Sequence, residues 1–328
     1  DRPTNWNEFS APQYELDMSM IKGQEFVKRA LEIAASGAHN ILMSGPPGSG
    51  KTLLARSFPS ILPKLTPDEA LEVTKIYSVA GLLPNGFVKE RPFRSPHHTA
   101  SGVSLVGGGK YPRPGEISLA HRGVLFLDEF PEFPRSVLES LRQPLEDGVI
   151  TISRIQSVLT FPARFILVAS QNPCPCGLSS DPDRQCICGP TQIAKYQKRI
   201  SGPLLDRIDL HVEVPRVQFE KLSSDTLGES STSIRQRVED ARDIQTRRFK
   251  DFNIHANSEM RNAEIREFCK LDDQSIDLLR AAVTQMHLSA RAYNRILKLS
   301  RTIADLGKSD NIELGHVAEA LQFRAKVE

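Results

Sequence analysis

The chain has 328 residues, of which 39% are hydrophobic and 25% are charged, and its formal net charge is +2. This composition is typical of a globular protein, and the small net charge excludes an overall attraction to nucleic acid. No apolar run approaches the roughly 20 residues that cross a bilayer, so we expect a cytoplasmic protein without membrane contact. The start at Asp1 is not a signal peptide, and it suggests a fragment whose N-terminal neighbour has been removed.

The N-terminal part of the chain alternates predicted helices with short apolar strands. Apolar residues at helical spacing predict a helix over 24–35, and a buried strand is predicted over 39–44. Thr66 and the following Pro67 are typical of a helix start. The further predicted elements, in chain order, are a helix over 50–61, a strand over 123–127, a helix over 134–145, a hairpin over 148–162, and strands over 165–169 and 208–214. This alternation predicts the α/β class with a parallel sheet.

Strand patterns stop after Pro215, and the rest of the chain is predicted to be helical. The predicted divisions are a linker remnant over 1–22, a core over 23–215, a linker with a long charged helix over 216–257, and an all-helical domain over 258–328. The core carries three predicted insertions, which cover residues 81–122, 148–162 and 172–190. The first insertion is rich in Gly, Pro, Ser and His, a composition typical of functional loops.

A glycine-rich segment after the strand over 39–44 matches the phosphate-binding pattern G-x-x-x-x-G-K-[ST]. Its glycines let main-chain N–H groups turn toward phosphate oxygens, and the helix that begins there adds its positive dipole end. Lys51 would place an ammonium on the β- and γ-phosphates, and Thr52 would offer its hydroxyl to Mg²⁺. The alternative is an ordinary Gly/Pro turn, which the flanking strand and helix disfavour. The predicted nucleotide-binding residues are Gly45, Pro46, Pro47, Gly48, Ser49, Gly50, Lys51 and Thr52.

Two carboxylates, Asp128 and Glu129, follow the apolar strand over 123–127. The carboxyl ends of strands are where open α/β sheets bind ligands. Asp128 is predicted to bind the nucleotide through Mg²⁺, and Glu129 is predicted to act as the general base on the attacking water. An acidic pair after an apolar run is often only a solvated strand end. Downstream of a phosphate loop, however, it favours ATP hydrolysis.

Four of the five cysteines lie close together, as the pairs Cys174/Cys176 and Cys186/Cys188. Four thiolates can surround Zn²⁺ as a tetrahedron and hold a long loop that has little core of its own. A structural zinc site is therefore favoured over free or redox-active thiols, and over disulfides across the two pairs. Cys269 is predicted to be a core residue on an apolar helix face.

Local positive charge is concentrated in the insertion over 81–122 and in the hairpin over 148–162. Basic groups mixed with rings and glycines suit a loop that grips a sugar–phosphate strand. The alternative is a pair of ordinary solvated surface loops. The candidate DNA contacts are Arg94, Lys110, Arg113 and Arg154.

Several of these motifs together carry a resemblance to a known family. They are Lys22–Glu25, the phosphate loop, Gly123–Phe130, Asn172–Gly177, Arg199–Asp209 and Leu288–Leu306. Residues 22–215 resemble the magnesium-chelatase-like AAA+ ATPases, in particular the competence protein ComM (YifB) group, and the tail resembles the helical lid of that group. The resemblance implies a three-layer AAA+ P-loop NTPase domain followed by a helical lid. Members of that group also carry an N-terminal domain resembling the Lon protease fold, and we expect this fragment to be without it.

The resemblance assigns roles to three more residues. Asn172 matches the polar sensor that holds the attacking water, and Arg291 matches the second sensor, which lies on the lid. Arg207 matches the arginine that acts in trans on the ATP of a neighbouring subunit in a hexameric ring. Its guanidinium would neutralise charge on the transferring phosphoryl group. The alternative for Arg207 is a surface ion pair with Asp206 or Asp209.

The leading hypothesis is an ATP-driven hexameric helicase that acts on single-stranded or branched DNA and promotes branch migration in natural transformation. ATP and Mg²⁺ follow from the residues, whereas the DNA role depends mainly on the resemblance. One alternative is a magnesium-chelatase-type motor that drives metal insertion by a partner enzyme. Another is a protein-remodelling ATPase. Stimulation of ATP hydrolysis by single-stranded DNA, but not by unfolded protein or porphyrin partners, would distinguish these three hypotheses.

Overall fold

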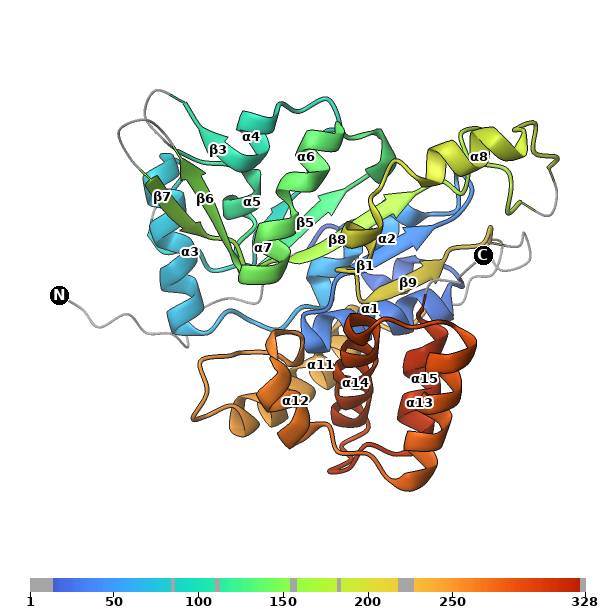
Figure 1. Ribbon diagram of the computed structural model, residues 1–328. Helices are drawn as coiled ribbons and strands as arrows, with labels where there is room; N and C mark the ends of the chain where they lie inside the picture. The colour runs from blue at the N-terminus through green and yellow to red at the C-terminus, as the bar shows by residue number, and fades with distance from the viewer. Residues whose placement is uncertain are drawn as a thin grey trace.

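The computed structural model describes residues 14–83, 86–109, 113–153, 158–181, 184–217 and 227–324. Its centre is a five-stranded sheet in which every pair of neighbouring strands runs parallel (Figure 1). Across the sheet, the strands are β2 (Phe93–Arg94), β5 (Val124–Leu127), β8 (Ile166–Gln171), β1 (Ile41–Ser44) and β9 (Leu210–Glu213). The α/β prediction with a parallel sheet is therefore confirmed.

Side chains alternate along the central strands between two separate cores, one on each face of the sheet. In β5, Val124 and Phe126 belong to one core, and Leu125 and Leu127 belong to the other. All four residues are buried, which explains the uninterrupted apolar run of this strand. The sheet is thus the middle of three layers.

One face of the sheet is covered by α1 (Glu25–Gly37), α2 (Lys51–Ser57) and α11 (Ser231–Arg248), whose apolar residues share the first core. The other face is covered by α4 (Gly102–Val106), α5 (Glu116–Leu119), α6 (Arg135–Ser140) and α9 (Gly202–Leu205). The remaining elements of this part are α7 (Arg142–Asp147), α8 (Pro190–Gln197), the short strands β3 (Gly107–Gly108) and β4 (Arg113–Pro114), and the 3₁₀ turns η2 (Met18–Met20), η3 (Phe58–Ile61) and η4 (Phe130–Glu132).

Helix α3 (Pro67–Ala80) begins where its capping residues predict. The Thr66 hydroxyl accepts from the main-chain N–H of Glu69, and the Glu69 carboxylate accepts from that of Thr66. This reciprocal cap satisfies two N–H groups that the first turn leaves free. The helix ends at Gly81, which adopts a left-handed conformation with φ of 72°.

Two segments differ from the sequence prediction. The insertion over 81–122 is more than loop, because it contains β2, α4 and α5 and contributes Leu105 and Ile117 to the second core. These elements are too short for periodicity to reveal. The helix predicted over 134–145 is divided into α6 and α7 near Leu141, shortly before Pro144, which has no N–H to continue a helical ladder.

The predicted hairpin is present as β6 (Val149–Ser153) and β7 (Val158–Pro162), which pair antiparallel. Its strands project from the sheet end that carries α3, as Figure 1 shows. Arg154, which lies between the two strands in the sequence, and Lys110 in the first insertion are outside the described residues.

The C-terminal helices form a bundle under the sheet. They are α12 (Asn262–Phe268), α13 (Asp273–Gln285), α14 (Ala290–Leu306) and α15 (Leu314–Gln322), preceded by the 3₁₀ turn η5 (Asn257–Glu259). Helix α14 packs on α1 and α11, so the bundle shares the first core (Figure 1). Cys269 is buried in that core, as predicted. The divisions at 215 and 257 stay predictions. Among the described helices, none combines the length and apolar character that crossing a bilayer requires.

A buried carboxylate joins α11 to α14. Asp305 is fully buried and accepts from Arg248 at 2.7 Å, from Arg301 at 3.1 Å and from the Asn257 amide at 2.8 Å. Two guanidinium groups and one carboxylate are thereby removed from water with their hydrogen bonds largely satisfied.

We predict that Asp305→Ala lowers the free energy of unfolding by about 3 to 5 kcal/mol, because it leaves two buried cations without their counter-ion. Urea denaturation of the two proteins measures this difference. The control is Asp277→Ala, which removes the carboxylate of an ion pair to Arg280 whose two side chains are 70% and 71% exposed. It should change stability little. Equal effects of the two substitutions would contradict the role given to Asp305.

Candidate functional site

Three predicted site segments meet at the carboxyl edge of the sheet. The phosphate loop follows β1, Asp128 and Glu129 follow β5, and Asn172 follows β8. Because β1 and β5 both pair with β8 in parallel, their carboxyl ends lie side by side. The structure therefore brings together the residues that the sequence assigned to one nucleotide site.

The phosphate loop has the backbone that its glycines predict. Gly48 and Gly50 have φ values of 79° and 93°, which residues with a Cβ rarely adopt. A Cβ at Gly45 would collide with the carbonyl oxygen of Val214, so this turn also requires glycine. The Ser49 hydroxyl is buried and has no hydrogen-bond partner among the described residues. An open loop with an unsatisfied buried hydroxyl fits a phosphate tail.

Lys51 points its ammonium back into the phosphate loop. Its Nζ donates to the carbonyl oxygens of Gly45 at 2.7 Å and Pro46 at 2.9 Å, and to Asn172 Oδ1 at 3.3 Å. Burial lowers the pKa of Lys51, while the charge of Asp128 opposes this effect. A buried cation held mainly by neutral oxygens is stabilised by an arriving phosphate.

Thr52 and Asp128 lie together as the predicted magnesium ligands. The Thr52 hydroxyl donates to Asp128 Oδ2 at 2.8 Å, and the other carboxylate oxygen of Asp128 is hydrogen-bonded to the hydroxyl of Ser170. A hydroxyl and a carboxylate, completed by phosphate oxygens and waters, are the ligands that Mg²⁺ prefers. The donor set therefore fits Mg²⁺. Ser170 was not singled out in the sequence, because a serine inside a strand carries no signal of this role.

Glu129 is held in a conformation that is unusual for a residue with a side chain. Its φ of 52° is left-handed, which costs about 1 to 3 kcal/mol and is typical of functional sites. Its main-chain N–H donates to Asp128 Oδ1 at 3.0 Å, and its half-exposed carboxylate lies 3.1 Å from Nδ1 of His98. His98 thus contacts the proposed base. Sequence reasoning missed this contact, which arises because β2 and β5 are neighbours.

Gln24 connects the start of α1 to the phosphate loop. Its amide nitrogen donates to the carbonyl oxygen of Pro215 at 2.6 Å and to that of Ser49 at 3.4 Å. The segment before α1 and the end of β9 therefore flank the phosphate loop on one side.

Arg207 and Arg291 lie at the opposite, amino edge of the sheet. Arg207 lies three positions before the start of β9, and its carbonyl oxygen accepts from the side chain of Asn40, which precedes β1. The guanidinium of Arg207 is buried against Glu146 and the carbonyl oxygen of Pro203, while Arg291 lies 3.7 Å from Glu146. Glu146 therefore takes the place of the predicted partners Asp206 and Asp209. The length of β1 separates Arg207 from the phosphate loop of its own chain.

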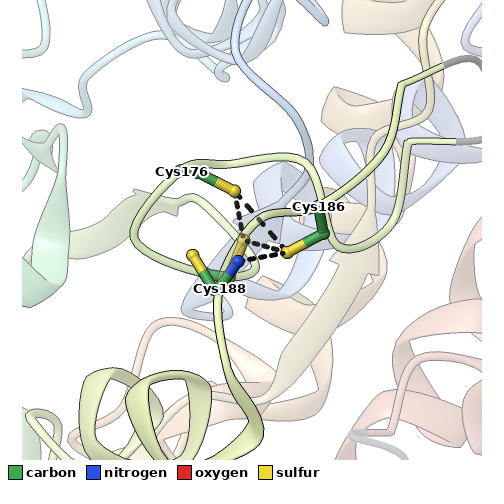
Figure 2. A group of neighbouring side chains, drawn as sticks. Cys176, Cys186 and Cys188 are labelled. Carbon is green, nitrogen blue, oxygen red and sulfur yellow. Dashed lines mark hydrogen bonds between the residues drawn. The ribbon is translucent and has the colours of Figure 1, made fainter.

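The four clustered cysteines converge as predicted. Their sulfur atoms all lie within 4.8 Å of one another, and the closest pairs are 3.4, 3.6 and 3.7 Å apart. Figure 2 shows Cys176, Cys186 and Cys188 directed at a common point. A zinc ion with Zn–S bonds of about 2.3 Å requires S–S separations of about 3.8 Å, so the arrangement fits zinc. Main-chain N–H groups of Ile187 and Leu178 lower the pKa of Cys176 to about 6, which favours the thiolate.

The cysteine loop lies against the phosphate loop. At Gly177, where φ is 80°, a Cβ would lie 2.6 Å from Cδ of Pro47. This contact leaves no room for a side chain, and Asn172 begins the same loop. Whatever holds the cysteines therefore also positions Asn172 and the phosphate loop.

The structure places two of the four candidate DNA contacts. Arg94 forms a two-pronged ion pair with Glu116, with distances of 2.6 and 2.7 Å, so its guanidinium is already bound to a carboxylate. Arg113 is exposed in β4. Lys110 and Arg154 lie outside the described residues, and all four assignments stay predictions.

Comparison with known proteins defines the class to which this fold and site belong. Residues 17–222 match the family described as magnesium chelatase, subunit ChlI, and residues 228–324 match the C-terminal part of that subunit. The chain therefore belongs to the magnesium-chelatase-like AAA+ family, as the motifs predicted.

Two bacterial proteins are similar to this chain along almost its whole length. It is 49% identical to competence protein ComM of Haemophilus influenzae over 317 residues, and 47% identical to the uncharacterized protein YifB of Escherichia coli over 311 residues. These alignments cover 95% and 94% of this chain and 60% of each relative, so the chain spans about 60% of their length. The 38 kDa magnesium-chelatase subunit of Cereibacter sphaeroides is 27% identical over 173 residues, which is 47% of this chain and 52% of that protein.

We predict that the purified protein contains one zinc ion per chain, because four thiolates form one tetrahedral set. Inductively coupled plasma mass spectrometry measures this content. Cys176→Ser combined with Cys188→Ser should abolish zinc binding and lower the melting temperature, whereas Cys269→Ser, which alters a cysteine outside the cluster, should leave the zinc content unchanged. Metal-free protein in which the four cysteines are freely alkylated and the melting temperature is unchanged by added zinc would contradict this assignment.

Proposed function

We propose that this chain is the ATP-hydrolysing motor part of a protein that acts on DNA. The observation that carries the ATPase proposal is the convergence, at one sheet edge, of the phosphate loop with Asp128, Glu129 and Asn172. Membership in the magnesium-chelatase-like AAA+ family supports the same chemistry. The substrates are ATP and water.

The side chains divide the work of hydrolysis. The Lys51 ammonium would turn from the loop carbonyls to the β- and γ-phosphates, and Thr52 and Asp128 would hold the Mg²⁺. Bound Mg²⁺ would neutralise charge on the phosphate oxygens. Glu129 accepts the proton of the attacking water after its carboxylate leaves His98, and Asn172 orients that water. His98 thus occupies the base until the nucleotide and the attacking water are in place.

A nucleotide site completed by a second copy is part of this proposal. Within one chain Arg207 lies at the sheet edge opposite the phosphate loop, so it reaches phosphates only on a neighbouring chain. Head-to-tail contacts of this kind repeat around a closed ring. We assign the assembly as a homo-hexamer, in which Arg207 stabilises the phosphoryl group of the adjacent subunit and Arg291 senses nucleotide state.

The DNA role of the proposal is supported by two features. The chain is 49% identical to a protein named for competence, and DNA uptake requires motors that move strands. The hairpin of β6 and β7 projects beyond the sheet, and the exposed Arg113 lies in the first insertion. The proposed activity is helicase-type branch migration on single-stranded or branched DNA during natural transformation. A chelatase-type motor is the second candidate, because a magnesium-chelatase subunit aligns with about half of the chain.

We predict that single-stranded DNA stimulates ATP hydrolysis several-fold, whereas unfolded protein does not. Release of phosphate with and without each polymer is the measurement. Glu129→Gln should bind ATP and lose at least about 100-fold in turnover, because water has no base, while Lys51→Ala should lose nucleotide binding. Stimulation by a porphyrin-inserting partner instead of DNA would assign the chelatase role. Near-normal turnover by Glu129→Gln would remove Glu129 as the base.

We predict that Arg207→Ala and Lys51→Ala are each inactive alone and regain activity when mixed. In mixed assemblies the intact Arg207 of one chain faces the intact phosphate loop of another, so some interfaces become complete. Turnover is measured across mixing ratios. The control replaces the first partner by the double variant Arg207→Ala/Lys51→Ala, which should restore nothing. Absence of recovery at every ratio, with mixed assemblies verified by mass, would contradict the trans role.

A further inference from the structure

A second polar cavity lies at the amino edge of the sheet, between the core and the C-terminal helices. Its volume is about 560 Å³, and its lining includes the residues directly before three strands, Asn40, Gly123 and Asp209. It is therefore separated from the phosphate loop of the same chain by the length of the strands. The lining includes nine basic and six acidic side chains, an excess that favours an anionic occupant.

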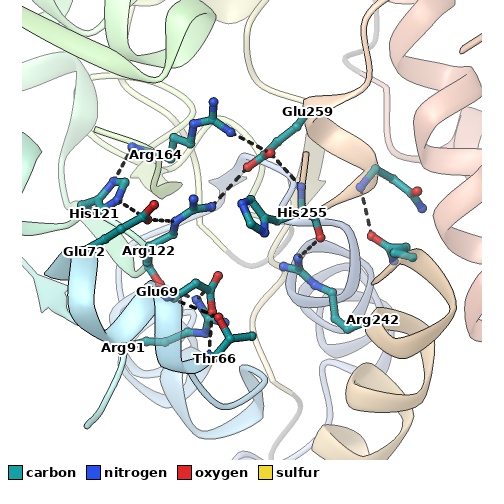
Figure 3. Close-up of polar contacts among 12 residues, drawn as sticks. Thr66, Glu69, Glu72, Arg91, His121, Arg122, Arg164, Arg242, His255 and Glu259 are labelled. Atoms are coloured by element: carbon teal, nitrogen blue, oxygen red, sulfur yellow. Dashed lines mark hydrogen bonds and ion pairs between the residues drawn. The ribbon is translucent and has the colours of Figure 1, made fainter. Parts of the chain in front are cut away.

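The inner part of this cavity is formed by arginines from different elements, which we call the arginine cluster: Arg91, Arg122, Arg164 and Arg242. Figure 3 shows Arg91, Arg122 and Arg164 on the core side and Arg242 beside His255 on the other. The N–H groups of Arg91 already have acceptors within the protein, because they donate to Glu69 at 2.7 Å and to three carbonyl oxygens. The other three arginines are less completely satisfied.

Arg122 and Arg164 share one carboxylate from the helical region. Glu259 lies 2.9 Å from Arg164 and 3.6 Å from Arg122, and Glu72 accepts from Nε of Arg122 at 2.8 Å. Each arginine has N–H groups beyond these contacts. Arg122 also has a left-handed φ of 59°, and its side chain is 7% exposed. Arg122 is thus a buried cation that keeps N–H groups for a further acceptor beside its two carboxylates.

Arg242 has no carboxylate within ion-pair distance among the described residues. It donates to the carbonyl oxygen of Ala35 at 3.1 Å and to that of His255 at 3.3 Å. Burial, followed by the charge of Arg91, lowers the pKa of Arg242 to about 10. A bound anion would stabilise the charge of this guanidinium, because its present hydrogen-bond partners are neutral and its surroundings disfavour the cation.

We infer that the arginine cluster is a binding site for a phosphate-bearing small molecule, distinct from the nucleotide site at the carboxyl edge. Guanidinium groups bind phosphate oxygens with paired N–H donors, and the cavity is large enough for a ligand of nucleotide size. Arg122 and Arg164 belong to the core, whereas Arg242 belongs to α11. The ligand would therefore contact both the sheet side of the cavity and α11, which packs on α1.

Calorimetric titration with pyrophosphate in magnesium-free buffer tests this site. The protein is the full chain with Lys51→Ala, which weakens binding at the phosphate loop. We expect one pyrophosphate per chain to bind in this background. Adding Arg242→Met should weaken binding about tenfold or more, because a charge-assisted hydrogen-bond donor is lost. Adding Glu259→Gln should tighten binding several-fold, because it frees N–H groups of Arg122 and Arg164 and removes a negative charge.

The opposite directions of these two effects distinguish binding from damage to the fold, since destabilisation does not tighten a site. Arg280→Met, which alters an exposed arginine on α13, should leave the affinity unchanged. Thermal unfolding without ligand verifies that each variant is folded. No binding in the Lys51→Ala protein, or an affinity insensitive to Arg242→Met and Glu259→Gln, would overturn the inference. Binding seen only in assembled protein would assign the phosphate to a nucleotide on a neighbouring copy, and would also overturn it.

Discussion

Because the five strands pair in parallel, the two groups of functional polar residues in this molecule lie at opposite edges of one sheet. The carboxyl edge holds the phosphate loop and the two acidic residues after β5, where converging strand ends position short side chains precisely enough to touch. The amino edge holds Arg207 and the arginine cluster. Asn40 is the common anchor at that edge, because its side chain binds both the carbonyl oxygen of Arg207 and the N–H of Leu167. A strand of four residues thus keeps two sets of charged groups apart.

The parts of the fold that the sequence predicted are those with a local physical cause. An uninterrupted apolar run predicted β5, and shorter apolar runs predicted β1 and β8, because strands buried on both faces have no polar side. Capping residues predicted the start of α3, and the glycine pattern predicted a loop whose backbone needs positive φ. The same holds for the nucleotide site, since each of its segments follows one of these strands directly.

The contacts that the sequence did not predict depend on which elements become neighbours. His98 and Glu129 are 31 positions apart in the sequence, and they meet only because β2 joins the sheet beside β5. Glu146, near the end of α7, meets Arg207, which lies between α9 and β9, whereas the sequence offered only adjacent aspartates. Likewise, the burial of Arg242 could not be predicted from the sequence of a charged helix, because it results from the packing of α11 against α1. Predicting these contacts would have required the strand order of the sheet and the packing of the helices.

The close approach of Gly177 to Pro47 makes the cysteine loop and the phosphate loop a single mechanical unit. The amides around Gly48 are packed against this neighbouring segment, which a metal bound by the four cysteines would hold in place. If the cysteine loop became flexible, the phosphate loop would no longer be supported on that side. Its backbone would then be less preorganised for binding a triphosphate. Oxidation or metal loss at cysteines that contact no nucleotide would in this way change how well the phosphate loop is formed.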